Sequence, residues 1–599
     1  MKLKDTYTRR IHLFLSLVLF IFSISSVSLS DSYGTIWGSI EEKNHRPLER
    51  VNIFIRNKTK DFEKKITSDL SGAFRFPGIP IGQYFIRIEA NGYQALHIEN
   101  IFIEPSCTIY LEVILNQKEN KEPSSSSVFR VDFPNRANQT SLNETQIHNS
   151  PTAHNVWSLV ENQDLSATTN RIDVGGLWGT TPALFSARGG SSWTQSIYLL
   201  NGMEVTNPYN TGSPLFFPDF YSLHYSNLYN SSLPPEALSP GGFLNIITRE
   251  GTDQFHGSIS SFLIHKILQS SNISPALIKE GITDSHSFNY LTDGNINLSG
   301  PIIPGKLTFF TSLTNFQLSQ DLAEYEKENK SSVLSGLLSL RYRYLNGSLL
   351  FLWTGQTISH PSFGAERQIP FSSTIDLKEK YHVFQAIWDS RIRDRHFFKA
   401  GFSFSQGDMN SDAQTGSSGQ HGIDIFKGIP SGAVPFTGQN QRDSLTFLLK
   451  GESLAENFLK AKHKFQYGFQ LQRSFASSQK TIQDNLHLRF FDNTPVEVVK
   501  YNTPVHHQEA ALHLNFFVQD TLVFSNLLSI YFGMHIVSSK GWIPDLVSSF
   551  EKNEIRWLHI SPRLGITFPL SRSKTSALKI SAARYYFTLP LSYLTYGNP

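Results

Sequence analysis

Residues 462–473 read Lys-His-Lys-Phe-Gln-Tyr-Gly-Phe-Gln-Leu-Gln-Arg, and apolar and polar side chains alternate through most of this stretch. A period of two places successive side chains on opposite faces of a β-strand. Residues 335–344 and 528–535 show the same alternation. A membrane barrel needs one apolar and one polar face on each strand, because lipid lies outside and water or protein inside. A soluble sandwich also alternates, so further features are needed to distinguish the two folds.

The composition favours the barrel and excludes several other classes of protein. Charged residues make up 17% of the 599 residues, and aromatic residues make up 13%. The mean hydropathy of −0.23 excludes a protein built from many membrane-spanning helices. The net charge of +3 is spread along the chain and gives no support for nucleic-acid binding. A single cysteine excludes a disulfide scaffold and any cysteine-based metal site.

Residues 1–30 are predicted to be a signal peptide for export. Four basic residues lie among the first ten, and an apolar run of 12 residues follows at 13–24. This run is too short to cross a bilayer of about 30 Å as a helix. Ser28 and Ser30 place small residues before a cleavage site at Asp31. A membrane anchor is the alternative interpretation.

Residues 31–116 are predicted to form a small β-sandwich. Short β-prone runs at 51–55 and 84–88 alternate with turn sequences at 69–72 and 77–80. Six or seven such strands in about 80 residues are typical of a sandwich. The order and spacing of these motifs resemble the carboxypeptidase regulatory-like domain, which implies an accessory module and not a catalyst. Residues 117–150 are rich in polar side chains, with four consecutive serines at 124–127, and predict a flexible linker.

Residues 151–254 are predicted to be an α+β domain. Phe185-Ser-Ala-Arg-Gly189, Ile197-Tyr-Leu-Leu-Asn-Gly-Met-Glu-Val205 and Gly241-Gly-Phe-Leu-Asn-Ile-Ile-Thr-Arg-Glu-Gly251 resemble, in combination, the plug domain of TonB-dependent outer-membrane receptors. The positions that match this plug signature are Arg188, Gly189, Asn201, Gly202, Gly241, Gly242 and Asn245. Asn-Gly at 201–202 is a strong signal for a hairpin turn.

Residues 255–599 are predicted to form a transmembrane antiparallel β-barrel. Runs at 298–310, 517–520, 561–565 and 596–599 resemble segments of the same receptors. The region contains about 13 strand-like runs, whereas these receptors have about 22 strands. The resemblance therefore implies that the C-terminal part of the barrel is absent. The expected fold is mainly β, with an N-terminal β-sandwich, an α+β plug and a partial barrel.

No motif in the sequence predicts a catalytic, metal or cofactor site. His506 and Glu509 have the spacing of zinc ligands in carboxypeptidases, but no motif supplies a third ligand, and both lie in a predicted barrel strand. Phosphate-binding loops and nucleophile motifs are also absent from the sequence. We therefore expect a protein that is not an enzyme and carries neither metal nor cofactor.

The resemblance implies a receptor in the outer membrane that imports a ligand through TonB and its inner-membrane energy complex. The ligand class stays open between siderophore, glycan, peptide and cobalamin-like molecules. A passive binding or adhesion barrel is one alternative, and a glycan importer with a surface lipoprotein is another. Val128, Phe129, Arg130 and Val131 form a β-prone run in the place where this family carries its TonB-contact segment. Lumen-facing polar residues are expected to hydrogen-bond the plug, namely Arg341, Arg343, Gln466 and Gln470.

Overall fold

In the computed structural model, most of the chain after residue 32 is described. The described residues are 33–42, 46–57, 62–70, 72–103, 108–117, 127–133, 138–171, 182–187, 193–231, 233, 236–237, 241–271, 273–392, 396–417, 419–458, 461–524, 528–544, 554–570, 577–586 and 588–595. The predicted signal peptide, Arg188 and Gly189 lie outside them. Among the described residues, no helix has the length and apolar character required to cross a bilayer.

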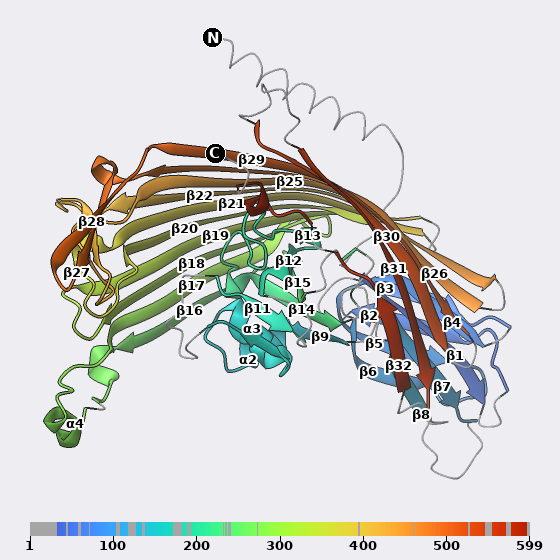
Figure 1. The fold of residues 1–599 in the computed structure, drawn as a ribbon. Helices are drawn as coiled ribbons and strands as arrows, with labels where there is room; N and C mark the ends of the chain where they lie inside the picture. Colours follow the sequence, from blue (N-terminus) through green and yellow to red (C-terminus); the bar gives the residue numbers. More distant parts are fainter. Residues whose placement is uncertain are drawn as a thin grey trace.

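The N-terminal domain is a β-sandwich of two four-stranded sheets (Figure 1). One sheet has the order β4-β1-β7-β8, and the other has the order β3-β2-β5-β6. The strands are β1 (Tyr33–Glu42), β2 (Asn52–Asn57), β3 (Glu63–Thr67), β4 (Ala73–Pro80), β5 (Gly82–Glu89), β6 (Leu96–Ile103), β7 (Thr108–Leu115) and β8 (Ser127–Phe133). The core between the sheets is dominated by β-branched residues, among them Ile36, Ile53, Ile86 and Ile109, with Phe76 fully buried.

The predicted linker at 117–150 is wrong in extent, because much of it belongs to the two neighbouring domains. Residues 127–133 form β8, which pairs antiparallel with β7. Residues 138–143 form β9, which pairs with a plug strand. The Asn143 side chain accepts from the Gln146 backbone, and the Gln146 side chain accepts from the Asn143 backbone, which starts helix α2. Sheet edges and this capping box supply the backbone partners that a solvated linker lacks.

The plug begins at β9 and not at residue 151 as predicted. Its five-stranded sheet has the order β13-β12-β15-β14-β9, and α3 packs against β9, β10 and β14. Its elements are β9 (Asn138–Asn143), α2 (Glu144–Asn149), α3 (Val156–Gln163), β10 (Ala167–Thr169), β11 (Phe185–Ala187), η1 (Trp193–Gln195), β12 (Ile197–Leu200), β13 (Met203–Glu204), η2 (Phe220–Ser222), β14 (Leu223–Ser231) and β15 (Phe243–Thr248).

The largest unit is a curved antiparallel sheet of 13 strands within the described residues, and the plug lies in its concave side (Figure 1). Its strands, in sheet order, are β16 (His256–His265), β17 (Ser287–Ile303), β18 (Leu307–Asp321), β19 (Glu328–Tyr344), β20 (Gly347–Phe363), β21 (Ile375–Ile392), β22 (His396–Ala413), β25 (Thr437–Phe458), β26 (Ala461–Thr481), β29 (Val505–Val523), β30 (Ser529–Trp542), β31 (Glu554–Pro569) and β32 (Ala577–Ala583).

The burial pattern of this sheet separates a barrel from a soluble sandwich. On β31, Leu558, Ile560 and Leu564 are 69%, 51% and 50% exposed, whereas Ser561 and Arg563 are buried. The apolar face is therefore the outer one and the polar face is turned inward, toward the plug. This inverted pattern is that of a barrel in lipid.

The two ends of the large sheet differ. One end has short turns, such as the two residues between β19 and β20. The other end has long loops, two of which combine into a four-stranded sheet of β24 (Ile429–Ser431), β23 (His421–Asp424), β27 (Leu486–Phe491) and β28 (Thr494–Lys500). The β16–β17 loop at that end carries helix α4 (Pro275–Lys279). Short turns at one end and long loops at the other are typical of outer-membrane barrels.

The sandwich docks at the short-turn end. Ile81 is buried in one cluster with Tyr225 and Ile247 of the plug. A Cβ atom at Gly78 would lie 2.5 Å from the ring of Phe397, at the start of β22, and Gly78 has a φ of +59°. The sandwich thus touches the barrel through the last residues of β4 and the plug through Ile81, which lies between β4 and β5.

Candidate functional site

The interface between plug and barrel lumen is the candidate functional site. Its centre is the Asn201-Gly202 turn, which joins β12 to β13 in an antiparallel hairpin. The φ angles of Asn201 and Gly202 are +52° and +79°, a combination that Asn and Gly adopt most readily. Gly202 N donates to Asn245 Oδ1 at 3.1 Å, and Thr248 N donates to Asn201 Oδ1 at 3.0 Å.

Gly241 and Gly242 are required by close packing at the start of β12, at the opposite end of this strand from the turn. A Cβ atom at Gly241 would lie 2.1 Å from the Gln195 carbonyl oxygen. A Cβ atom at Gly242 would lie 2.1 Å from the Phe185 ring. The described members of the plug signature therefore position the Asn201-Gly202 turn and the strands beside it.

The barrel wall holds the turn through polar side chains. Gln385 donates to the Leu200 carbonyl oxygen at 3.0 Å, and its own carbonyl oxygen accepts from Asn201 Nδ2 at 3.2 Å. Lys399, which is 2% exposed, donates to the Asn201 carbonyl oxygen at 2.7 Å. Amide and ammonium groups can replace these hydrogen bonds with hydrogen bonds to water at a small cost in free energy. Moving an apolar side chain out of a packed core into water costs more.

A second set of contacts lies around η2. Gln356 bonds both the N–H and the carbonyl oxygen of Phe217, the N–H at 2.9 Å. Thr314 Oγ1 donates to Asp219 at 2.9 Å. Burial raises the pKa of Asp219 to about 6, and the hydrogen bond from Thr314 lowers it only in part. Tyr221 donates to Asp293 of β17 at 2.7 Å.

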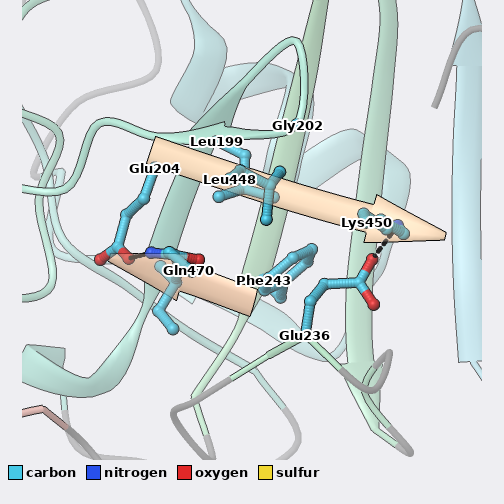
Figure 2. Close-up of a pocket in the computed structure, with 9 residues that line it drawn as sticks. Leu199, Gly202, Glu204, Glu236, Phe243, Leu448, Lys450 and Gln470 are labelled. Carbon is cyan, nitrogen blue, oxygen red and sulfur yellow. Dashed lines mark hydrogen bonds and ion pairs between the residues drawn. The ribbon is translucent and has the colours of Figure 1, made fainter. Parts of the chain in front are cut away.

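A small cavity lies between the plug sheet and strands β25 and β26 (Figure 2). Its volume of about 20 Å³ holds about one water molecule. Glu204 is directed at Gln470, with 3.4 Å between Gln470 Nε2 and Glu204 Oε2, and Glu236 forms an ion pair of 2.6 Å with Lys450 (Figure 2). Burial raises the pKa of Glu204 to about 7, because hydrogen bonds from Gln470 and Thr206 offset the lost hydration only in part.

Two arginines hold the plug at the short-turn end, where its chain continues into the barrel. Arg341 Nη2 lies 2.6 Å from Glu250 Oε1; the Arg341 side chain is 5% exposed and the Glu250 side chain 12%. Arg343 Nη1 lies 3.0 Å from Asp253 Oδ2. Of the four predicted lumen residues, Arg341, Arg343 and Gln470 contact the plug. For Gln466, the described contact is with the barrel itself, where its amide lies 3.4 Å from Glu452.

Toward the long-loop end, the plug loop around Tyr209 meets the barrel wall. The guanidinium of Arg442 lies 4.0 Å from the centre of the Tyr209 ring. The chain after β32 returns to this place: Leu591 N donates to the Pro208 carbonyl oxygen at 3.0 Å. The hydroxyl groups of Tyr209 and Thr595, in α5 (Ser592–Thr595), are 3.0 Å apart.

The sequence motifs did not reveal Glu204, Glu236, Tyr209 or Arg442. For Arg442 the available signal was its position on the polar face of an alternating strand, and Glu204 lies within the quoted plug motif; no pattern in the sequence singled out Glu236 or Tyr209. His506 and Glu509 point to opposite faces of β29, with His506 exposed and Glu509 fully buried. The two residues therefore do not converge on one site.

Known proteins resemble this chain in sequence and in fold. Residues 35–116 match the carboxypeptidase regulatory-like domain. The TonB-dependent transporter Oar of Myxococcus xanthus is 22% identical over 337 residues, which cover 52% of this chain and 29% of that protein. The outer-membrane transporter YddB of Escherichia coli matches with a TM-score of 0.58 and 15% identity, over 76% of this chain and 62% of that one.

The fold is that of TonB-dependent outer-membrane receptors. The ferric citrate transporter FecA in its unliganded form also matches, with a TM-score of 0.55 and 11% identity, over 76% of this chain and 64% of that one. The predicted fold class of sandwich, plug and partial barrel is thereby confirmed. The chain spans less than two thirds of the length of each of these three proteins.

Proposed function

We propose that this chain belongs to an outer-membrane transporter that imports an extracellular ligand and draws its energy from TonB. The observation that carries the proposal is the clamp on the Asn201-Gly202 turn. A plug fills the lumen, and Gln385 and Lys399 hold the turn through hydrogen bonds that water can replace. The similarity to Oar supports the same function.

In the proposed cycle, the ligand binds above the plug, and force from the inner membrane then moves the plug. The outer membrane has no ATP, so an external energy complex has to supply this force. One of the structural neighbours is named as a transporter of ferric citrate, which makes ferric chelates the first ligand class to test. Glycan, peptide and cobalamin-like ligands are the further classes.

For coupling, we propose that the segment with Val128, Phe129, Arg130 and Val131 pairs with TonB. In the structure this segment is β8, paired on one side with β7 and located at the edge of its sheet. TonB can therefore add a strand to the outer edge of β8 or replace β7 as its partner. Either route uses backbone groups and not side chains.

The deciding experiment is ligand uptake by cells with and without TonB, at equal surface levels of receptor. We expect uptake to depend on TonB. Uptake that persists without TonB would establish the passive barrel instead. Val131→Pro fixes φ and removes a backbone donor, so we expect it to abolish uptake, whereas Val131→Ala should have little effect. Normal uptake by the proline variant would exclude this segment as the coupling strand.

A further inference from the structure

The tip of the sandwich, residues 78–82, contacts two parts of the molecule that have to separate if the plug moves. Ile81 is the single residue between β4 and β5, and its side chain is buried against Tyr225 and Ile247 of the plug. The backbone at Gly78 lies so close to the ring of Phe397 in β22 that a Cβ atom would be 2.5 Å from it. The tip therefore bridges the plug and the barrel.

The tip has a fixed shape and directs one apolar side chain away from the sandwich. The Tyr84 hydroxyl donates to the Pro80 carbonyl oxygen at 2.7 Å, and the proline ring fixes φ at the residue before Ile81. Ile79 is part of the sandwich core, whereas Ile81 packs in a separate cluster with the plug. Ile81 thus contributes to docking and little to the fold of the sandwich itself.

On the plug side, the contact leads to the Asn201-Gly202 turn through one strand. Ile247 lies in β15, directly after Ile246. The Ile246 carbonyl oxygen accepts a hydrogen bond from Asn201 N at 2.8 Å, and Ile246 is paired with Leu200 in the parallel ladder between β12 and β15. A displacement of β15 at Ile247 is therefore passed to the backbone of the turn.

On the barrel side, the contact leads to the same turn through β22. Phe397 and Lys399 are two residues apart and each 2% exposed, so both lie on the inward face of this strand. Lys399 Nζ donates to the Asn201 carbonyl oxygen at 2.7 Å. The docked tip covers Phe397 and so limits the access of water to the neighbouring bond from Lys399.

We propose that the sandwich tip is a latch on the plug, a contact that has to open before the Asn201-Gly202 turn is released. While the tip is docked, the two routes hold the N–H and the carbonyl group of Asn201. Once the tip has undocked, Phe397 is uncovered and water can replace the bond from Lys399. The role in transport rests on the proposed function, whereas the coupling between tip and turn does not.

The test is hydrogen exchange of backbone amides at residues 197–205 in the purified chain in detergent. Ile81→Cys and Tyr225→Cys, combined with Cys107→Ser, allow a disulfide to lock the tip to the plug, and counting free thiols verifies the bond. We expect exchange at 197–205 to be roughly tenfold slower in the oxidised than in the reduced protein, because undocking is blocked. Ile81→Cys with Cys107→Ser alone is the matched control and should exchange equally under both conditions.

The opposite change is expected from Ile81→Asp, which places a charge in the apolar contact. This variant should exchange roughly tenfold faster at 197–205 than the wild type, and it provides the test if the disulfide does not form. Leu70→Asp, at a position 83% exposed, is the control and should have no effect.

Equal exchange at 197–205 in oxidised and reduced protein, or in Ile81→Asp and wild type, would overturn the latch. Acceleration confined to β14 and β15 would overturn it as well, because the tip would then only cover these two strands. These measurements involve neither cargo nor TonB, so failure of the latch and failure of energised uptake remain distinguishable.

Discussion

The sandwich and the plug are neighbours along the chain, yet their buried surfaces differ in kind. The sandwich core consists of isoleucine, valine, leucine and aromatic side chains that are almost fully buried. The surface between plug and barrel combines apolar contacts with Asn201, Gln356, Gln385 and Lys399. Exposing packed apolar side chains to water is unfavourable. Amide and ammonium groups, by contrast, can form hydrogen bonds to water in place of those to protein. The first surface suits a permanent fold and the second suits an element that moves.

The largest expected effect comes from a cavity in the sandwich core. Phe76→Ala should lower the free energy of unfolding of the sandwich by about 3–5 kcal/mol, because Phe76 is fully buried. Urea unfolding of the purified chain measures it. Phe102→Ala, at a position 37% exposed, is the control and should cost clearly less. Equal costs would contradict the contrast drawn between core and surface.

The next effect concerns the ion pair between Arg341 and Glu250 at the short-turn end. Arg341→Gln leaves the largely buried Glu250 without its cation and should cost the plug about 3 kcal/mol. The readout is the urea concentration at which a protease begins to cleave the plug. Arg489→Gln breaks an exposed pair with Glu497 and should cost less than about 1 kcal/mol. A plug that is no more sensitive in Arg341→Gln would show that this pair does not hold it.

Glu204 should make the stability of the plug depend on pH. Its pKa is about 7 in the folded protein against 4.5 in the unfolded chain, so the folded state holds the proton more tightly. The free energy of unfolding should therefore fall as the pH rises from about 4.5 to about 7. Glu204→Gln stays neutral and should remove this decline. Unfolding curves of the two proteins at several pH values provide the measurement. If the free energies of unfolding of the wild type and Glu204→Gln changed with pH in the same way, this role of Glu204 would be refuted.

The smallest expected effect lies where the sandwich meets the plug. Ile81→Ala removes apolar contact with Tyr225 and Ile247 and should weaken docking by about 1–2 kcal/mol. Hydrogen exchange of backbone amides in β14 and β15 should become faster, and Leu70→Ala, 83% exposed, should leave it unchanged. Unchanged exchange in Ile81→Ala would mean that the sandwich does not protect the plug.

Local patterns in the sequence determined the strands, their inner and outer faces, and the Asn201-Gly202 turn, because side-chain alternation and turn chemistry act over a few residues. The predicted linker is a region where local patterns were not sufficient. The run from Ser127 to Phe133 is short and flanked by polar residues, and only the backbone edge of β7 makes it a strand.

The contacts of the site were decided by the tertiary structure alone. Gln470 meets Glu204 across 266 residues of sequence, and Arg442 stacks on Tyr209 from a separate sheet. Alternation indicates that a side chain faces the lumen but not which plug residue lies opposite. That partner depends on how two independent sheets are placed against each other, and no local property of either strand encodes this placement.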